Sequence, residues 1–339
     1  MNTRSILILG LFSAAAAQPS SSAFADGYGV SQIFKVGGAG GMDYITVDSQ
    51  SHLLFVPRAT HTQVLDEATG RLVADIPGQK HNHGAAIVPG AGRGFISDGD
   101  DQSVVIFDLK TYEVLGKVKT PEDSDGIIYD DASGKVLLDC GDAGVMVPIS
   151  PDVDPKSGSA DPAVELGGKP EFLAADGKGR AYVNLEDKDQ VAVIDTKTMK
   201  VVAKWSVAPG GSPVGMAMDR ENRRLYIGCR KPQKMIVMDA DSGKILADLP
   251  IGAGVDATGF GGGDGFASCR DGTLTVVRET APGTFSVAQT VQTKLGAKTM
   301  ALDPGTQTIY LPTADFATGG TGRPAAKPDT FQVLVVKKS

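Results

Sequence analysis

Short runs of apolar residues, separated by polar turns, follow one another along the chain from residue 42 onward. The clearest units begin at Glu171 and Val214, and each contains four such runs. Within a unit, a first apolar run ends near an Asp, and the third run alternates apolar and polar residues before it closes on another Asp. Alternation with a period of two residues predicts strands with one buried face, whereas long amphipathic helices would show a period near 3.6. The pattern predicts an all-β protein.

The units recur at a nearly constant interval. The Asp that ends the first strand, or the residue in its place, occurs at Asp48, Pro89, Asp130, Asp176, Asp219, Gly261 and Asp303. Successive positions are 41 to 46 residues apart. A period in the forties with four short strands per unit is typical of a propeller blade. We therefore predict a seven-bladed β-propeller with four-stranded antiparallel blades, and residues 26–339 as its single domain.

The last unit lacks a fourth strand. Its third strand is expected at residues 331–336, and the chain stops at Ser339. Residues 29–36, which precede the first blade, have the pattern of a fourth strand. Placing them as the outer strand of the last blade would join the two ends of the ring and cover an exposed sheet edge. We predict this closure.

Residues 1–25 have the pattern of a signal peptide. Arg4 precedes an apolar stretch at residues 6–17, and Ala23-Phe24-Ala25 forms a small-x-small cleavage site. The apolar stretch is too short to span a bilayer. We therefore expect no membrane span, and we expect cleavage near Ala25 and a periplasmic or secreted mature protein.

The strings "RAYVNLEDKDQVAVIDTKTMKVVA", "RLYIGCRKPQKMIVMDADSGKILA" and "SHLLFVPRATHTQVLDEATGRLVA" carry a family resemblance. They resemble the YVTN-type, YncE-like seven-bladed β-propellers of exported bacterial proteins, and the resemblance extends over residues 28–339. It implies a binding or scaffold protein rather than an enzyme. A lactonase-type propeller is a second relation that the pattern allows, and it would imply a hydrolase. A purely structural or interaction protein is a third alternative, since a shared fold does not fix an activity.

Composition narrows the partners. The formal net charge is −7 and aromatic residues make up 6% of the chain, which disfavours a nucleic-acid groove. We expect a monomer that binds a small molecule or a protein at one face. The three cysteines, Cys140, Cys229 and Cys269, occupy the same repeat position. We interpret them as small buried residues rather than as a disulfide or a metal site.

Topology places the candidate site. In each blade the start of the first strand and the end of the second share one rim of the propeller. Charged residues at those positions form the predicted ligand-binding rim: Asp43, Arg58, Asp98, Asp125, Glu171, Arg230, Asp256, Arg270 and Lys298. The alternative is a solvated funnel mouth that holds no ligand. No catalytic residue is assigned.

Three of the four histidines are expected at this same rim. His61, His81 and His83 are predicted to lie within reach of Asp43 and Asp98. Imidazole and carboxylate ligands suit a divalent transition metal, so a metal cofactor and a metal-assisted hydrolase form a second hypothesis. The competing interpretation is an anion site built from the arginines, with the histidines as exposed bystanders.

Overall fold

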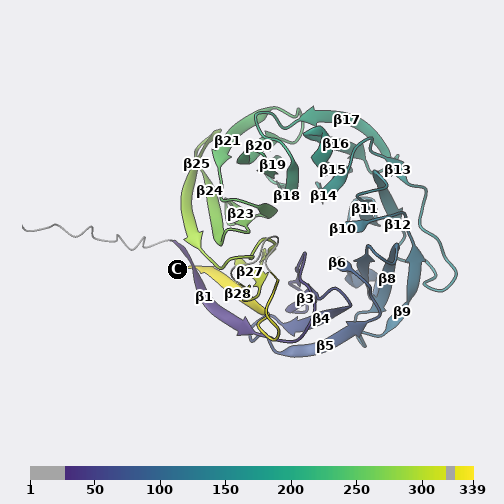
Figure 1. Ribbon diagram of the computed structural model, residues 1–339. Helices are drawn as coiled ribbons and strands as arrows, with labels where there is room; N and C mark the ends of the chain where they lie inside the picture. Colours follow the sequence, from purple (N-terminus) through teal and green to yellow (C-terminus); the bar gives the residue numbers. More distant parts are fainter. Residues whose placement is uncertain (1–26, 318–324) are drawn as a thin grey trace, which may run out of the picture.

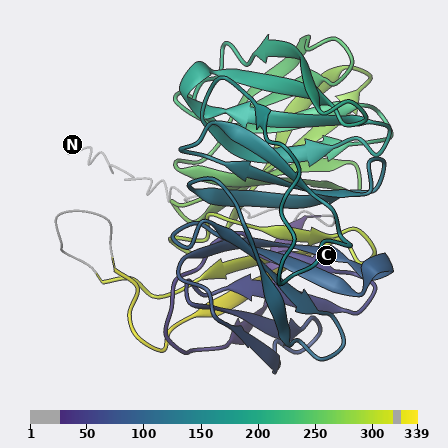
Figure 2. The ribbon, with the colours of Figure 1, turned by 90° about the vertical axis from the view of Figure 1, so that its right-hand side faces the viewer.

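Seven four-stranded antiparallel sheets surround a central axis in the computed structural model, which describes residues 27–317 and 325–339 (Figure 1). This confirms the predicted seven-bladed β-propeller. Within the first six blades, chain order runs from the axis to the periphery. Figure 2 shows the strands running between the two faces of the disc, so that the connecting loops gather on those faces. The proposed signal peptide, residues 1–25, lies outside the described residues.

The innermost strands are β2 (Thr46–Asp48), β6 (Asn82–Val88), β10 (Ser124–Asp130), β14 (Pro170–Ala175), β18 (Pro213–Asp219), β22 (Val255–Gly261) and β26 (Ala301–Asp303). The second strands are β3 (Leu53–Pro57), β7 (Arg93–Asp98), β11 (Lys135–Cys140), β15 (Arg180–Leu185), β19 (Arg224–Arg230), β23 (Asp264–Cys269) and β27 (Thr308–Thr313). Two short 3₁₀ turns are also present. The first, η1 (Pro89–Ala91), follows β6, and the second, η2 (Glu186–Lys188), follows β15.

The third strands are β4 (His61–Asp66), β8 (Ser103–Asp108), β12 (Val145–Ile149), β16 (Gln190–Asp195), β20 (Gln233–Asp239), β24 (Thr273–Ala281) and β28 (Gln332–Lys338). The outer strands are β5 (Leu72–Pro77), β9 (Val114–Lys119), β13 (Val164–Glu165), β17 (Lys200–Ser206), β21 (Ile245–Pro250), β25 (Thr284–Gln292) and β1 (Tyr28–Lys35).

The two ends of the chain close the ring in the last blade. Strand β1 pairs antiparallel with β28, with Gly29 opposite Lys337 and Phe34 opposite Val333. The predicted closure is confirmed, and the strand begins at Tyr28, one residue earlier than expected. In Figure 1 the purple β1 and the yellow β28 lie side by side. The β28 edge is thereby covered, and the blade gains its fourth strand.

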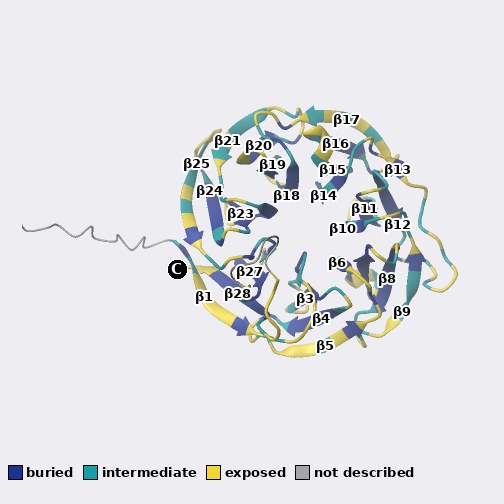
Figure 3. Ribbon diagram, in the orientation of Figure 1, coloured by how far each residue is buried: buried dark blue, intermediate teal, exposed yellow. Residues whose placement is uncertain are grey.

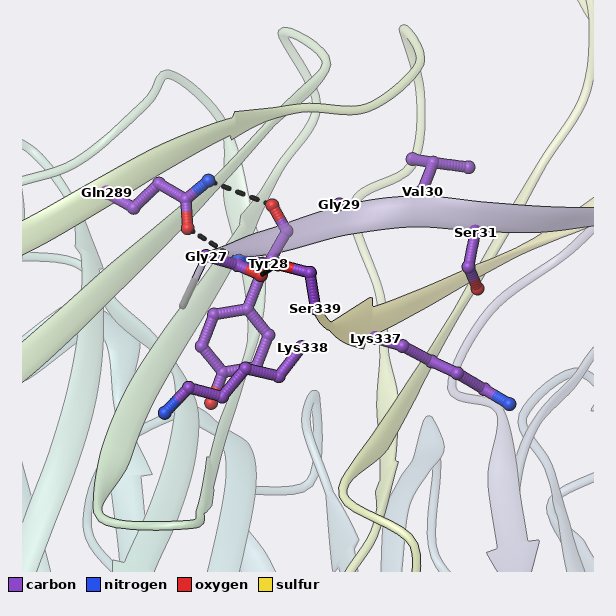
Figure 4. A pocket seen from close by; sticks show the side chains of 9 residues that line it. All are labelled: Gly27, Tyr28, Gly29, Val30, Ser31, Gln289, Lys337, Lys338 and Ser339. Carbon is purple, nitrogen blue, oxygen red and sulfur yellow. Dashed lines mark hydrogen bonds between the residues drawn. The ribbon is translucent and has the colours of Figure 1, made fainter. Parts of the chain in front are cut away.

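A small hollow of about 350 Å³ lies beside this closure, where β1 meets β25 of the preceding blade (Figure 4). The side-chain amide of Gln289 donates to the Tyr28 carbonyl and accepts from the Tyr28 N–H, each at 2.8 Å. These two bonds tie the outer strands of neighbouring blades together. The other lining residues belong to the two ends of the chain, so we interpret this hollow as part of the closure.

The core consists of apolar clusters between successive blades. Third-strand residues such as Val104, Ile106 and Val193 are fully buried or nearly so. The outer strands, in contrast, contain both exposed residues and residues that are at least half-buried (Figure 3). Cys140, Cys229 and Cys269 are buried free thiols whose pKa burial raises to about 12, which makes them poor nucleophiles. In the described residues, no helix is both long enough and apolar enough to cross a membrane.

Candidate functional site

A β-bulge lies near the start of five of the seven inner strands. In β6 the pairing passes from Asn82↔Asp98 to Ala85↔Ile96, and β10, β14, β18 and β22 show the same shift after their first residue. A bulge bends the strand and re-aims side chains. The bulged positions are His83, Asp125, Glu171, Val214 and Asp256.

Charged side chains from all seven blades meet around the axis at this level. Seven of them are joined by ion pairs, and we call them the axial ring: Asp43, His83, Asp125, Glu171, Arg230, Asp256 and Lys298. Each belongs to a different blade, in this order. The sequence predicted all seven as rim residues, six among the ligand-binding candidates and His83 among the metal candidates.

One half of the axial ring is centred on Asp43. Nδ1 of His83 lies 2.9 Å from Oδ2 of Asp43 and 3.3 Å from Oδ1 of Asp125. On the other side of Asp43, its Oδ1 lies 3.2 Å from Nζ of Lys298, which also pairs with Asp256. Two cations therefore separate three carboxylates.

The other half is centred on Arg230, which substitutes for an apolar residue. Blade five has Val214 at the bulged position, and the guanidinium of Arg230 reaches in from the end of β19. It pairs with Asp256, lies 3.4 Å from Glu171 and donates to Glu186 at 3.2 Å. The chain of pairs thus runs from Asp125 around the axis to Glu171.

The axial ring alternates in charge everywhere except at one junction. Seven members cannot alternate completely, because an odd ring must place two like charges side by side. Those two are Asp125 on β10 and Glu171 on β14, the inner strands of adjacent blades (Figure 1). Both side chains are only partly exposed, 18% and 15% respectively, so the repulsion is poorly screened.

Titration of the ring members follows from burial and these neighbours. Burial raises the pKa of Glu171 to about 7, with Arg230 opposing and Glu186 adding to the shift. Burial also raises the pKa of Asp125 well above its usual range, and the Glu171 charge adds to that shift although His83 opposes it. Burial opposes the charged form of His83, but Asp43 and Asp125 outweigh it and raise the His83 pKa to about 9.

Two aromatic rings form an apolar layer next to the axial ring. Tyr44 follows Asp43 and Phe172 follows Glu171, and their ring centroids are 4.6 Å apart. Because blades one and four are not neighbours, this contact spans the axis. Tyr44 belongs to an apolar cluster that includes Ala257 and Met300 of blades six and seven, and Phe172 packs against that cluster. The axial ring therefore lies over an aromatic layer at the centre of the propeller.

Other predicted rim residues have structural roles instead. Arg58 is 1% exposed, donates to the carbonyls of Gly37, Gly38 and Gly41, and stacks 3.7 Å from the Phe331 ring centroid. Its expected place at the ligand-binding rim is therefore corrected, since no donor is left facing solvent.

The remaining predicted residues lie near the axial ring without joining its chain of pairs. Asp98 is buried and accepts the backbone N–H groups of Lys80 and His81, which fixes that loop. Burial lowers the pKa of Lys298, but Asp43 and Asp256 outweigh it and raise that pKa. The positive charge of Arg270 is close enough to Lys298 to lower its pKa in turn. Arg270 thus remains a candidate residue of the rim, whereas Asp98 stabilises the loop that contains Lys80 and His81.

The histidines do not gather as predicted. Nε2 of His61 lies 3.9 Å from Asp75, and Nδ1 of His81 lies 3.6 Å from Asp100. The His81 ring packs against that of His83, with centroids 4.6 Å apart. In the part of the chain that the structure describes, the one group of three candidate ligands within 4.8 Å of one another is Asp43, His83 and Asp125.

Asp43 and Asp125 favour a proton on this imidazole and raise the pKa of His83 to about 9, against the effect of burial. A metal ion bound to these three residues would have to displace that proton, because a metal ligand is a neutral imidazole. Nδ1 is the atom that both carboxylates face. The protonated imidazole therefore links Asp43 to Asp125 as a metal ion would.

Sequence reasoning missed the aromatic layer, although a signal was present. In each blade one residue directly follows the axial-ring member, or Val214 in blade five: Tyr44, Gly84, Gly126, Phe172, Gly215, Ala257 and Thr299. Five are small and two are large aromatics, which indicates that Tyr44 and Phe172 fill the space that the others leave.

No model of a known protein family matches the chain, and no curated protein matches it. Solved structures do match, with 1648 chains similar to this one. One of them is the Kuenenia stuttgartiensis hydrazine synthase, at 14% identity and a TM-score of 0.50, covering 71% of this chain and 96% of that one. At that identity the likeness shows the fold alone. The protein is thus a seven-bladed β-propeller, in agreement with its own strand topology.

Proposed function

We propose that this chain is an exported binding or scaffold propeller of the YVTN-type, YncE-like kind, and that its ligand lies on the axial ring. The axial ring is the observation that carries the proposal. Burying paired charges generally stabilises a protein no better than apolar residues would, so a closed circuit of seven charged groups is poorly explained by blade packing alone. Clusters of perturbed carboxyl groups are typical of functional sites.

The chemistry of the axial ring favours binding over catalysis. Its cations and carboxylates are paired with one another, so neither Lys298 nor His83 offers a free base or nucleophile. A general base near neutral pH would need an accessible lone pair. The aromatic layer formed by Tyr44 and Phe172 closes the centre, so a ligand would enter and leave on the side of the charges.

Thermal unfolding in the presence of small molecules tests this proposal. A set of cationic, anionic and neutral compounds is screened against the wild type, Lys298→Gln and Lys110→Gln, an exposed control in blade two. Binding to the folded state raises Tm, and the shift should be lost in Lys298→Gln and retained in Lys110→Gln. The proposal fails if no compound shifts the wild type, or if Lys298→Gln responds as the wild type does.

A metal-assisted hydrolase is the second candidate, favoured by the approach of Asp43, His83 and Asp125 to within 4.8 Å. It would use these ligands to activate water. Metal analysis of untagged protein and a lactone hydrolysis assay test it. Bound metal and activity that disappear in His83→Gln but persist in His61→Gln would favour the hydrolase, whereas metal-free inactive protein would reject it.

Export is a separate part of the proposal and rests on residues 1–25. N-terminal sequencing of protein from the native host should give a mature chain that starts at Asp26. A cytoplasmic product that retains Met1 would contradict export without affecting the binding proposal.

A further inference from the structure

The like-charged junction of the axial ring lacks the cation that every other pair of neighbouring carboxylates has. Lys298 stands between Asp43 and Asp256, and His83 stands between Asp43 and Asp125. Arg230 stands between Asp256 and Glu171. Between Asp125 and Glu171 no ion pair of the described residues continues the chain. The charge of Lys169 does act on Glu171 and lowers its pKa, but its ammonium pairs with Asp142 at 2.8 Å and with Asp123 at 3.6 Å. A single positive charge there would make the alternation complete.

Two fully buried side chains, one in blade three and one in blade four, each have an oxygen atom without a hydrogen-bond partner. Asp139 and Asn184 are both 0% exposed, and Oδ2 of Asp139 and Oδ1 of Asn184 accept no hydrogen bond. Buried acceptors without a donor are costly and rare in folded proteins. This observation is independent of the charges of the axial ring, and it concerns the same two blades.

The position of Asp139 relates it to the junction, because the charges of Asp125 and Glu171 both act on it. Asp139 lies on β11 opposite the bulge that carries Asp125, and its Oδ1 accepts the Gly126 N–H at 2.8 Å. Asn184 lies on β15 opposite the bulge that carries Glu171. Its amide nitrogen donates to the carbonyls of Val214 and Gly215 at 2.8 and 3.1 Å, so the amide lies against blade five and only its oxygen is unused.

Oδ1 of Asp125 is a third such oxygen. It has an ion-pair partner in Nδ1 of His83 at 3.3 Å but accepts no hydrogen bond of good geometry. Of the buried side-chain atoms without a partner in the described residues, three are therefore oxygens of Asp125, Asp139 and Asn184. Blades three and four therefore contain buried oxygens without a hydrogen-bond donor as well as the two like-charged carboxyl groups of the junction.

The spread of these acceptors selects the kind of cation. The described residues bring three ligand atoms within 4.8 Å of one another only at Asp43, His83 and Asp125, so Asp125, Glu171 and Asp139 do not converge on one point. A bare metal ion needs such convergence. An ammonium group on an organic molecule carries up to three N–H donors that reach separate acceptors, and aromatic faces such as those of Tyr44 and Phe172 attract organic cations.

We propose that the junction between Asp125 and Glu171 binds the protonated amine of a small organic ligand. This inference rests on the proposed function and names the ligand class for that same site. The amine takes the place of the missing cation, and no covalent step is involved.

Calorimetric titration with n-butylammonium, butan-1-ol, butyrate and Mn²⁺ tests the inference on the full-length mature protein. The wild type is expected to bind n-butylammonium and none of the other three. Glu171→Gln and Asp125→Asn should each weaken that binding by 10-fold or more. The matched controls Glu113→Gln and Asp152→Asn change exposed acids in other loops and should bind as the wild type does.

A structural role for Glu171 is separated from a binding role by the thermal stability of the unliganded variants. Glu171→Gln removes the repulsion, so it should raise Tm while it weakens binding, and a variant that merely misfolds would lower both. The inference is overturned if n-butylammonium does not bind, if Glu171→Gln binds it as tightly, or if Mn²⁺ binds in its place. Binding of butan-1-ol or butyrate at the axial ring would overturn the amine inference and leave the proposed function standing.

Discussion

The carboxyl group of Glu171 shows how burial and pairing compete at a single residue. Burial raises its pKa to about 7 although Arg230 lies 3.4 Å away, because Glu186 and Asp256 share that guanidinium. The unfolded chain loses this proton near the ordinary value of 4.5, while the folded protein keeps it to about pH 7. Over that range the folded state binds more protons, so stability falls as pH rises.

Glu171→Gln should remove this pH dependence. A pKa difference from 4.5 to about 7 corresponds to about 3 kcal/mol of unfolding free energy lost by the wild type between pH 4.5 and pH 7.5. Glutamine resembles the protonated acid, so the variant should keep most of that free energy. Urea unfolding at pH 5 and pH 7.5 measures it, with Glu113→Gln as the control. Equal pH dependence in the variant and the wild type would contradict the raised pKa.

Arg58 illustrates a charged residue that serves the fold. Its guanidinium donates to three glycine carbonyls and to Gln63, and the segment that it holds, residues 37–41, leads into the first blade. Arg58→Ala leaves those acceptors buried without donors and creates a cavity beside Phe331, so it should cost about 4 kcal/mol. Denaturant unfolding of Arg58→Ala and of the exposed control Arg71→Ala measures the difference. A cost below about 1 kcal/mol for Arg58→Ala would place its side chain in solvent.

The charged positions of the site could be predicted from the sequence and their partners could not. Seven candidates converge on the axial ring because strand direction alone fixes which ends of the strands share a rim. Arg58 and Asp98 have the same topological position, but they are buried by contacts with loop backbone that no periodicity reveals. His61 turns toward Asp75 on its own blade, a rotamer choice that is invisible in sequence.

At the scale of elements, bulges and residue size build the site. Five inner strands carry a bulge, and in four of them the bulged residue belongs to the axial ring. Gly126 illustrates the constraint, since a Cβ there would lie 2.5 Å from Oδ2 of Asp139. Small residues at these positions let the strands approach, and Tyr44 and Phe172 fill the remaining space.

The contact across the axis predicts an energetic coupling between blades one and four. A double-mutant cycle of Tyr44→Ala and Phe172→Ala should show about 1 kcal/mol of coupling, because aromatic pairs at this distance contribute that much beyond burial. Tyr44→Ala combined with Phe95→Ala, in a different apolar cluster, should be additive within about 0.5 kcal/mol. Chemical unfolding followed by the fluorescence of Trp205, the single tryptophan, measures both cycles. Additivity for the first pair would mean that the rings do not meet.

At the scale of the whole molecule, the repeat predicted the fold because each blade buries its faces only against its neighbours. The missing fourth strand of the last blade was visible as an unmatched pattern at residues 29–36, and β1 takes that place. The closure makes the molecule a ring in which every blade has two neighbours. A weakened closure should therefore lower the stability of distant blades as well, which an open stack would not do.

Two neighbouring positions in β1 test this ring cooperativity. Phe34 is 4% exposed and stacks on Tyr310 at a centroid distance of 6.5 Å, whereas Ile33 is 44% exposed on the same strand. Phe34→Ala should cost about 3 kcal/mol and Ile33→Ala less than about 0.5 kcal/mol. Because the blades form a closed ring, the loss should appear in full in the fluorescence of Trp205, which lies in blade four. An unchanged Trp205 midpoint in Phe34→Ala would show that blade four unfolds independently of the closure, and equal costs for the two variants would place the wrong face of β1 against the core.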